Sequence, residues 1–376
     1  MADTINIGNY EVSCFKVGSS DCKIYLGDTL LYPHSTPTVK DYFRFVTRGD
    51  GYFTFYGVTE TTANTLSYSL DSGTTWETLV HQGTTPYLDA GDVIMWKGEN
   101  LVTNAQGMGR FSASTDFDVE GNVMSLHFGD DFEDKYDLSD IPWAFCTLFS
   151  GCTNVINASG LTLPATTISH DCYSHLFKDC SRLQSIPQSL PAMTMKDKCY
   201  YNMYYGCSGL TANAVPINYL PATTMALACY WAMFQWCSTI TSAMSVLPAK
   251  TLAQGCYCNM FSRCTSLVTP PVISATTVAS GCCQNMFYSG TSLTTTTSYM
   301  LAAPALTNYC YSQMFYYCSK VDKITCLATS NINTNYSTNN WVRGVKSSGT
   351  FTRASGVGWS SGNNGRPSGW TLVNYT

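Results

Sequence analysis

The chain has 376 residues, a formal net charge of −5 and only 12% charged residues, so neutral polar side chains are expected to cover much of its surface. A chain with this charge balance lacks the basic surface that nucleic-acid binding needs, and no apolar run approaches the ~20 residues of a membrane span. The N-terminus also lacks the basic and apolar regions of a secretory signal. We therefore expect no nucleic-acid partner, no membrane insertion and no export by the general secretory route.

Residues 1–36 contain two segments with alternating apolar residues, EVSCFKV and CKIYLGDTLLY, on either side of Gly-Ser-Ser-Asp. This pattern predicts a small β-hairpin. The stretch CKIYLGDTLLYP resembles short segments of phage tail proteins, where such a module commonly lies at one end of the polypeptide. The resemblance implies that residues 1–36 attach the chain to other virion proteins.

Residues 37–112 have the pattern of an all-β domain, with turn signals at Gly49-Asp50-Gly51 and Asp71-Ser72-Gly73. They predict a small β-sandwich. The run SLDSGTTW at 69–76 resembles the Asp-box hairpin of sialidase-type propellers. Because only one copy is present, we interpret it as a turn that folds a hairpin rather than as a glycan site.

Residues 113–140 are predicted to cap the following repeats at their N-terminal end, with a strand at 123–128 covering the open end. Six acidic residues between 130 and 140 lack the ligand spacing of a calcium loop. They predict a solvated acidic turn.

Residues 141–329 repeat a nine-residue unit, Cys-Tyr-x-x-Met-Phe-x-x-Cys, at intervals of 26 to 30 residues. A Leu-Pro-Ala-Thr-Thr-Leu-like run, predicted to be a short strand, opens each repeat, and Ser/Thr-x-Leu follows the unit. Positions 1, 5 and 9 recur at i, i+4 and i+8, with positions 2 and 6 beside them, which predicts one apolar stripe on a short helix. Six copies are expected, at 172–180, 199–207, 229–237, 256–264, 282–290 and 310–318, after a degenerate one at 144–152.

Eighteen cysteines raise the alternatives of buried thiols, disulfides and zinc. Free cysteine is among the most buried residue types, which favours a thiol core. Cysteines eight apart on a helix lie ~12 Å from each other, too far for a disulfide, and no Cys-x-x-Cys pair suits zinc. The predicted structural core of the repeats contains Cys172, Cys180, Cys199, Cys207, Cys229, Cys237, Cys256, Cys264, Cys310 and Cys318.

The motif Met-Phe-x-x-Cys-Ser/Thr-x-Leu, followed at a distance by Leu-Pro, is similar to the leucine-rich repeats of the Bacteroides surface protein A (treponemal) type. The resemblance covers residues 144–329, although the repeat is longer here and Met stands where the family has Ala. It implies a β-rich multidomain chain built around a leucine-rich-repeat solenoid of short strands and short helical turns. It also implies an adhesin or host-contact role rather than an enzyme.

Residues 330–376 change in composition to Asn, Ser, Gly and Trp, and predict a C-terminal β-cap. The alternative is a carbohydrate-stacking module that uses Trp341, Trp359 and Trp370.

The sequence shows no Gly-x-Ser-x-Gly elbow, no phosphate loop and no histidine pair at zinc spacing, so we expect no catalytic residue, metal or cofactor. The informative positions are those that the apolar stripe leaves outside, where large aromatic residues recur. Either they form a binding ridge, or they pack against adjacent repeats or a second chain. The candidate ridge comprises Tyr201, Tyr205, Trp231, Trp236, Tyr288, Tyr316 and Tyr317.

The leading hypothesis is a non-enzymatic bacteriophage virion protein, a tail or head fibre or appendage, that displays its repeats for contact with a glycan or protein of the host surface. The alternative is a bacterial cell-surface adhesin, and a third hypothesis is a glycan-acting enzyme using the Asp-box region. Fibres are commonly homotrimers, but this is analogy only and leaves the oligomeric state open.

Overall fold

The computed structural model describes residues 40–57, 66–98, 103–104, 107–294 and 299–376, and the backbone of four strands nearer the N-terminus. The chain divides into two compact units, Met1–Asp41 and Tyr42–Thr376. In the first unit, β1 (Thr4–Ile7) pairs with β2 (Tyr10–Ser13), and β3 (Ile24–Leu26) pairs with β4 (Thr29–Tyr32), both antiparallel. Among the described residues, the strands of the two predicted segments, β2 and β3, belong to different sheets, and the turn expected between them lies outside the described residues.

The second unit begins with a six-stranded sheet in the order β12-β11-β5-β9-β7-β8. A separate antiparallel pair, β6 and β10, packs on it through aromatic rings, since Phe45 lies 4.9 Å from both Phe53 and Phe111. Two strands of the larger sheet, β11 and β12, lie beyond the end of the predicted sandwich at residue 112. The bounds are β5 (Phe43–Thr47), β6 (Phe53–Gly57), β7 (Leu66–Ser69), β8 (Glu77–Leu79), β9 (Val93–Lys97), β10 (Gly109–Ala113), β11 (Phe117–Asn122) and β12 (Val155–Thr162).

The predicted strand at 123–128 is wrong. Strand β11 ends at Asn122, whose Oδ1 accepts the N–H of Met124, and the four-residue helix α1 (Ser125–Phe128) and the 3-10 turn η2 (Gly129–Asp131) follow. The acidic stretch is bonded to the rest of the fold at more than one point: Tyr42 donates to Asp130 at 2.5 Å, Lys97 forms an ion pair with Asp130 at 2.9 Å, and the Leu138 N–H donates to the Thr167 carbonyl at 2.9 Å.

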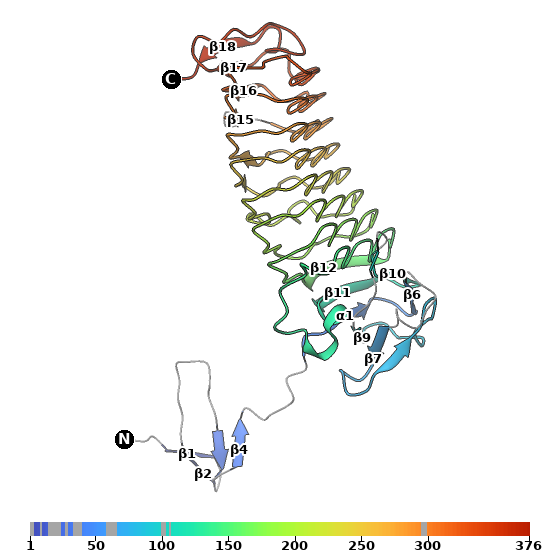
Figure 1. Ribbon diagram of the computed structural model, residues 1–376. Coiled ribbons are helices and arrows are strands. Elements are labelled where there is room, and N and C mark those ends of the chain that lie inside the picture. Colours follow the sequence, from blue (N-terminus) through green and yellow to red (C-terminus); the bar gives the residue numbers. More distant parts are fainter. Residues whose placement is uncertain are drawn as a thin grey trace. The chain divides into compact units, whose positions relative to one another are not determined.

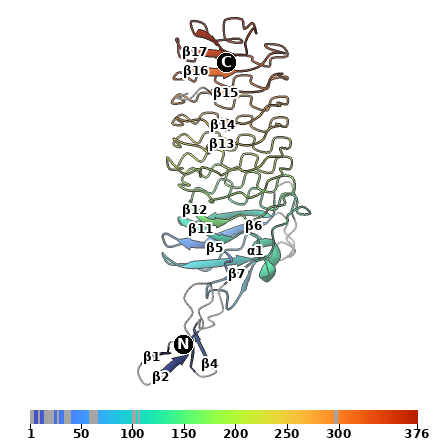
Figure 2. The ribbon, with the colours of Figure 1, turned by 90° about the vertical axis from the view of Figure 1, so that its left-hand side faces the viewer.

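The repeats follow as stacked coils, which Figures 1 and 2 show from two sides. We call residues 141–345 the repeat stack. The short strands that join consecutive coils run parallel: β13 (Val246–Leu247) with β14 (Val272–Ile273), and the sheet β15-β16-β17-β18 at the C-terminal end. That last sheet comprises β15 (Tyr299–Leu301), β16 (Lys323–Cys326), β17 (Thr350–Arg353) and β18 (Thr371–Asn374).

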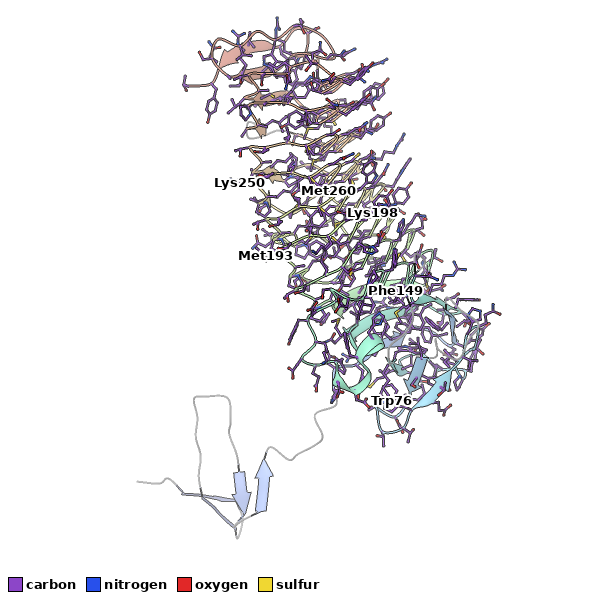
Figure 3. All side chains as sticks on the ribbon, in the orientation of Figure 1. Trp76, Phe149, Met193, Lys198, Lys250 and Met260 are labelled. Carbon is purple, nitrogen blue, oxygen red and sulfur yellow. The ribbon has the colours of Figure 1, made fainter. Side chains whose placement is uncertain are left out.

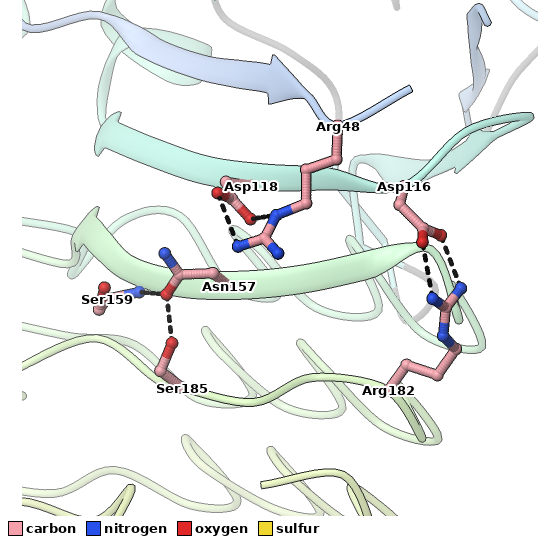
Figure 4. A network of polar contacts seen from close by, with 7 residues as sticks. All are labelled: Arg48, Asp116, Asp118, Asn157, Ser159, Arg182 and Ser185. Carbon is pink, nitrogen blue, oxygen red and sulfur yellow. Dashed lines mark hydrogen bonds and ion pairs between the residues drawn. The ribbon is translucent and has the colours of Figure 1, made fainter. Parts of the chain in front are cut away.

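The sheet and the repeat stack meet through parallel pairing and a polar network (Figure 4). Asp116, the residue before β11, accepts two 2.6 Å hydrogen bonds from Arg182, which belongs to a later repeat. Asn157 of β12 accepts from the hydroxyl of Ser185. The bonds from Arg182 hold the pKa of the Asp116 carboxyl below its usual range. Backbone pairing and side-chain hydrogen bonds therefore both join the sheet to the repeat stack.

The nine-residue units contain no helix, so the predicted fold class, a leucine-rich-repeat solenoid with helical turns, is wrong. Across the described residues α1 is the sole α-helix, and it lies outside the repeats. Each unit is a chain of tight turns in which positions 0, 4 and 8 have positive φ, where position 0 is the residue before position 1. This holds at all 24 such positions of eight copies, 19 non-glycine and five glycine, with φ between 49° and 78°.

The backbone hydrogen bonds explain this geometry. In the copy at 199–207 the N–H groups of odd positions close four-residue β-turns, as from Tyr205 to Asn202 at 3.1 Å. Those of even positions instead cross to odd-position carbonyls of the next copy, as from Asn202 to Trp231 at 2.9 Å. Because the N–H groups alternate between bonds within the copy and bonds to the next copy, the buried backbone donors of the unit have partners without an α-helix.

The predicted apolar stripe is nevertheless buried, because a period of four also aligns positions 1, 5 and 9. Rings at position 6 stack along the repeat stack, as between Phe234 and Phe261 at 5.5 Å and 1°. Rings at position 2 form a second column, as between Tyr173 and Tyr200 at 5.5 Å and 4°. These two columns form much of the core.

An eighth copy of the unit, which the sequence reading assigned to the C-terminal cap, lies at 337–345. Its carbonyls accept from the seventh copy as the others do, including a 2.8 Å bond from Phe315 to Trp341. A following segment covers its free edge, since Asn364 Oδ1 accepts the N–H of Asn340 at 2.7 Å and the carbonyl of Gly365 accepts from the Trp341 indole at 2.6 Å.

The positive-φ positions give a first testable prediction. Asn259, at position 4 of its copy, has φ 56°. Valine there should lower the free energy of unfolding by about 1–2 kcal/mol or more, because a β-branched residue is strained in this region. Urea unfolding would measure the change, and Asn259→Gly is the matched control, expected to cost less than ~1 kcal/mol. Equal losses in both variants would contradict the assigned backbone conformation.

Candidate binding surface

The seven candidate ridge residues lie at positions 3, 7 and 8 of the units, but position 3 is not an outer position, since Cys258 and Ser312 there are 1% and 2% exposed. The structure divides the ridge residues into two rows. At position 3, Tyr201 and Trp231 are half-buried and stack at 6.2 Å and 25°. Trp231 also covers Gly255 of the next copy, where an added Cβ would lie 2.9 Å from its ring. This row is therefore partly a packing feature.

The other row, at positions 7 and 8, combines rings and arginines along the last five copies. Arg263 lies over Trp236 at 4.5 Å and over Tyr288 at 5.4 Å. Tyr288 stacks on Tyr316 at 5.0 Å and 5°, and Arg343 lies over Tyr316 at 5.6 Å. We call this the aromatic–arginine row; its members are Trp236, Arg263, Tyr288, Tyr316, Tyr317 and Arg343.

Both alternatives for the ridge are thus combined in this row. The ring faces pack between adjacent copies, while their edges remain accessible, and Trp236 and Tyr317 are 43% and 47% exposed. Tyr317 lies 4.4 Å from Tyr316, edge to face, and a hydrogen bond between them raises the pKa of the Tyr316 phenol. The row therefore offers ring edges, phenol groups and guanidinium groups rather than open ring faces.

The remaining ridge residue, Tyr205, belongs to an earlier copy with a different charge pattern. Lys178 lies over its ring at 5.7 Å, but Lys178 is paired with Asp179 at 3.0 Å. Its positive charge is therefore locally compensated, unlike the arginine charges of the later copies.

The repeat cysteines act as buried hydrogen-bond donors. From the second copy on, the thiol of each position-9 cysteine donates to the position-6 carbonyl of the preceding copy, as from Cys207 to Phe177 and from Cys264 to Phe234, both at 3.0 Å. The sixteen cysteines of the described part are free and buried, and burial raises the pKa of Cys258 to about 12. Such thiols are poor nucleophiles.

The three C-terminal tryptophans proposed as a carbohydrate-stacking alternative are buried. Trp341, Trp359 and Trp370 are 0%, 6% and 3% exposed, and Trp341 stacks on Trp359 at 5.6 Å. They form the core of the C-terminal cap and cannot stack on a sugar.

The Asp-box-like run forms the hairpin between β7 and β8, as predicted. Asp71 accepts hydrogen bonds from the backbone and hydroxyl of Thr75 and from Ser69, which lower its pKa to about 2. The Trp76 indole donates to the Gly73 carbonyl at 3.1 Å. These polar groups serve the turn itself.

Two hollows lie at the opposite, position-0 end of the units. One of ≈ 590 Å³ mixes acids and bases, with His170 Nδ1 3.3 Å from Asp171 and the Asp197 carboxylate accepting from the Leu227 N–H. The other, of ≈ 350 Å³, is lined by Ser, Leu, Thr and Asn and contains no charged side chain. Neither includes a ridge residue.

Within the described ranges, no three His, Cys, Asp or Glu side chains are placed to share a metal ion, and no helix is long and apolar enough to cross a membrane. Protein-family models, curated proteins and solved structures provide no match to the chain. The resemblances stated above therefore remain predictions.

The sequence reading missed Arg263 and Arg343. Both occupy the same outer positions as the ridge aromatics, Arg263 at position 8 and Arg343 at position 7 of the unrecognised eighth copy. Reading every residue of these two columns, instead of the aromatics alone, would have found Arg263.

Proposed function

We propose that the chain is a non-enzymatic bacteriophage virion protein, a tail or head fibre or appendage, whose repeat stack displays the candidate ridge to the host surface. The observation that carries the proposal is the aromatic–arginine row, which extends over five consecutive copies with its ring edges exposed. Tyrosine and tryptophan supply large contact areas at low cost in conformational entropy.

The construction of the stack suits display. Each copy is bonded to the next through four backbone N–H groups of the turn unit, so the outer side chains are held in fixed register. A surface that is ordered before binding loses less entropy when it meets a partner.

Two further features support assembly in a virion. Buried free thiols suit a protein that folds in a reducing cytoplasm. The segment CKIYLGDTLLYP, which resembles phage tail modules, would attach the chain to other virion proteins.

The ridge can be tested by removing its two most exposed rings together. Trp236→Ala with Tyr317→Ala should reduce binding of labelled protein to host cells at least ~10-fold, because each ring is a surface contact worth about 1 kcal/mol or more. Melting temperature should remain close to that of the wild type. Flow cytometry on a panel of Bacteroides strains, the host type that the repeat resemblance suggests, measures the binding.

The matched control removes two other exposed tyrosines, Tyr309 and Tyr336, which stack at 5.2 Å at the position-0 end. This double alanine variant should retain binding. If both double variants bind equally well, the ridge is not the contact surface. An antibody against the repeat stack that labels bacterial cells but not purified phage particles would favour the cell-surface adhesin.

A further inference from the structure

The net charge of −5 is the sum of two halves of the chain that carry opposite net charges. Residues 198–376 contain nine Lys and Arg residues and a single acid, Asp322, a balance of +8. Residues 1–197 contain the other 11 basic and 24 acidic residues, a balance of −13. The repeat stack from the third copy onward is therefore cationic, although the whole protein is acidic.

The two arginines of the row differ from several other cations of the chain, including Lys346 of the cationic half, which pairs with Asp322 at 2.9 Å. In the acidic half, Arg48, Lys97, Lys178 and Arg182 each lie 2.6–3.0 Å from a carboxylate. In the cationic half, neither Arg263 nor Arg343 has a side-chain hydrogen bond or ion pair with any residue that the structure describes. Their guanidinium groups lie over aromatic rings.

The packing leaves the guanidinium edges available. The Arg263 guanidinium lies over the ring of Trp236 in the preceding copy and over the ring of Tyr288 in the following copy, so it is held by a ring on each side along the stack. A guanidinium group held in this way is already ordered for two parallel hydrogen bonds to a carboxylate. Arg343 is exposed and lies against Tyr316.

We propose that the aromatic–arginine row binds an acidic linear polysaccharide along the axis of the repeat stack. Arg263 and Arg343 bind carboxylates of the chain, and the edges of Trp236 and Tyr317 contact its sugars. The two arginines are three repeat intervals apart, which is about 14 Å at the spacing of adjacent strands. This inference rests on the proposed host-surface function and names the chemical class of the ligand.

A polysaccharide fits the row better than a nucleic acid does. Single-stranded nucleic acids bind by stacking bases on open aromatic faces, but the faces of Tyr288 and Tyr316 are occupied by each other and by the arginines. Duplex DNA presents about one charge per 1.7 Å, far denser than two arginines ~14 Å apart. Widely spaced carboxylates match the row.

The test measures binding of the full chain to immobilised alginate, a polyuronate, and to propylene glycol alginate, in which the carboxylates are esterified. Wild-type protein should bind alginate, bind the ester at least ~10-fold more weakly, and lose affinity between about 50 and 500 mM salt. Arg263→Gln with Arg343→Gln should weaken alginate binding ~10-fold or more, since two charge-assisted hydrogen-bonding groups are lost. The corresponding lysine double variant should be intermediate, because it keeps the charge but not the planar fork.

The matched control, Lys198→Gln with Lys250→Gln, makes the same change in net charge outside the row. Figure 3 labels both residues and shows Lys250 at the edge of the stack away from the turn units. This control should change alginate affinity less than about twofold, since exposed charges beyond a Debye length are screened.

The outcomes separate this inference from the proposed function. Equal binding of alginate and its ester, lost in Trp236→Ala with Tyr317→Ala but kept in the double glutamine variant, overturns the acidic ligand and leaves the ridge as the contact surface. Tighter binding of an oligodeoxythymidylate than of alginate also overturns it. Failure of the wild type to bind alginate overturns it too, and the cell-binding assay then decides the host-surface function alone.

Discussion

Replacing Phe234 by alanine should lower the free energy of unfolding by about 3–5 kcal/mol, the range found for deletion of a buried phenylalanine. Phe234 is fully buried at position 6 of the fourth copy, in the middle of the repeat stack. Its ring lies between Tyr204 at 5.4 Å and Phe261 at 5.5 Å, so its removal opens a gap in the column on both sides.

The position of Phe234 adds a second expected effect. Repeat arrays are stabilised by contacts between neighbours, so a gap in the middle weakens two interfaces at once. We expect the urea transition of Phe234→Ala to move to a lower urea concentration. It should also broaden, because the parts of the stack on either side of the gap then unfold at different urea concentrations. The urea transitions measured by circular dichroism and by tryptophan fluorescence would then no longer coincide.

A surface ring provides the control for this deletion. Tyr309 stacks on Tyr336 at 5.2 Å but is 41% exposed, and Tyr309→Ala should cost less than ~1.5 kcal/mol. A loss for Phe234→Ala as small as that for Tyr309→Ala would show that the ring column does not stabilise the stack.

The repeats and their buried positions could be predicted from the sequence, but the local backbone could not. The residues at positions 1, 5 and 9 are buried, as expected. Cys229, Met233 and Cys237 of the fourth copy are an example. In an α-helix, positions 1 and 9 would differ by about 80° around the axis, whereas in a four-residue period they coincide. The identical residues at positions 1 and 9 were the signal for a period of four residues rather than the 3.6 residues of an α-helix.

The positive-φ residues show why that signal was weak. Glycine and asparagine favour this conformation, and Asn202, Gly206, Gly255 and Asn259 have it. However, Trp236, Arg263 and other large residues adopt it too, because bonds to the neighbouring copies fix the backbone. Tertiary context therefore decides the conformation where local preference opposes it.

The candidate surface was predicted in part. The ridge aromatics at positions 7 and 8 lie at the outer edge of the units, but the division of the ridge into a packed row and a mixed row depends on which copies are neighbours. The arginines were missed because a net charge of −5 conceals a cationic half, and because the copy that contains Arg343 has Ser337, Thr338 and Trp341 where others have Cys, Tyr and Met.

Acidification should destabilise the protein between pH 6.5 and pH 4 through one buried histidine. His127 of α1 is 3% exposed, and its Nε2 lies 2.9 Å from the carbonyl of Ala144, at position 1 of the first copy. Phe111 N–H donates to Leu148 of the same copy at 2.8 Å. Together they occupy carbonyls that, in later copies, accept from the preceding copy, so neutral His127 closes the N-terminal end of the stack.

Burial disfavours the imidazolium and lowers the pKa of His127 from 6.5 to about 4. The unfolded chain therefore binds one more proton than the native protein within this interval. The stabilisation by His127 is complete above pH 6.5 and is lost as the pH falls to 4, by about 3 kcal/mol in total. Below pH 4 the Asp71 carboxyl, with a pKa of about 2, contributes a separate loss.

Urea unfolding at pH 7, 6, 5 and 4 measures the slope, and His127→Gln identifies its source. Glutamine offers an amide donor to the Ala144 carbonyl but does not titrate, so this variant should be less stable at pH 7 and should lose about 3 kcal/mol less on acidification. His175, whose pKa is also lowered by burial, should give the variant a smaller residual slope. An unchanged slope in His127→Gln would mean that the cap does not depend on a neutral imidazole.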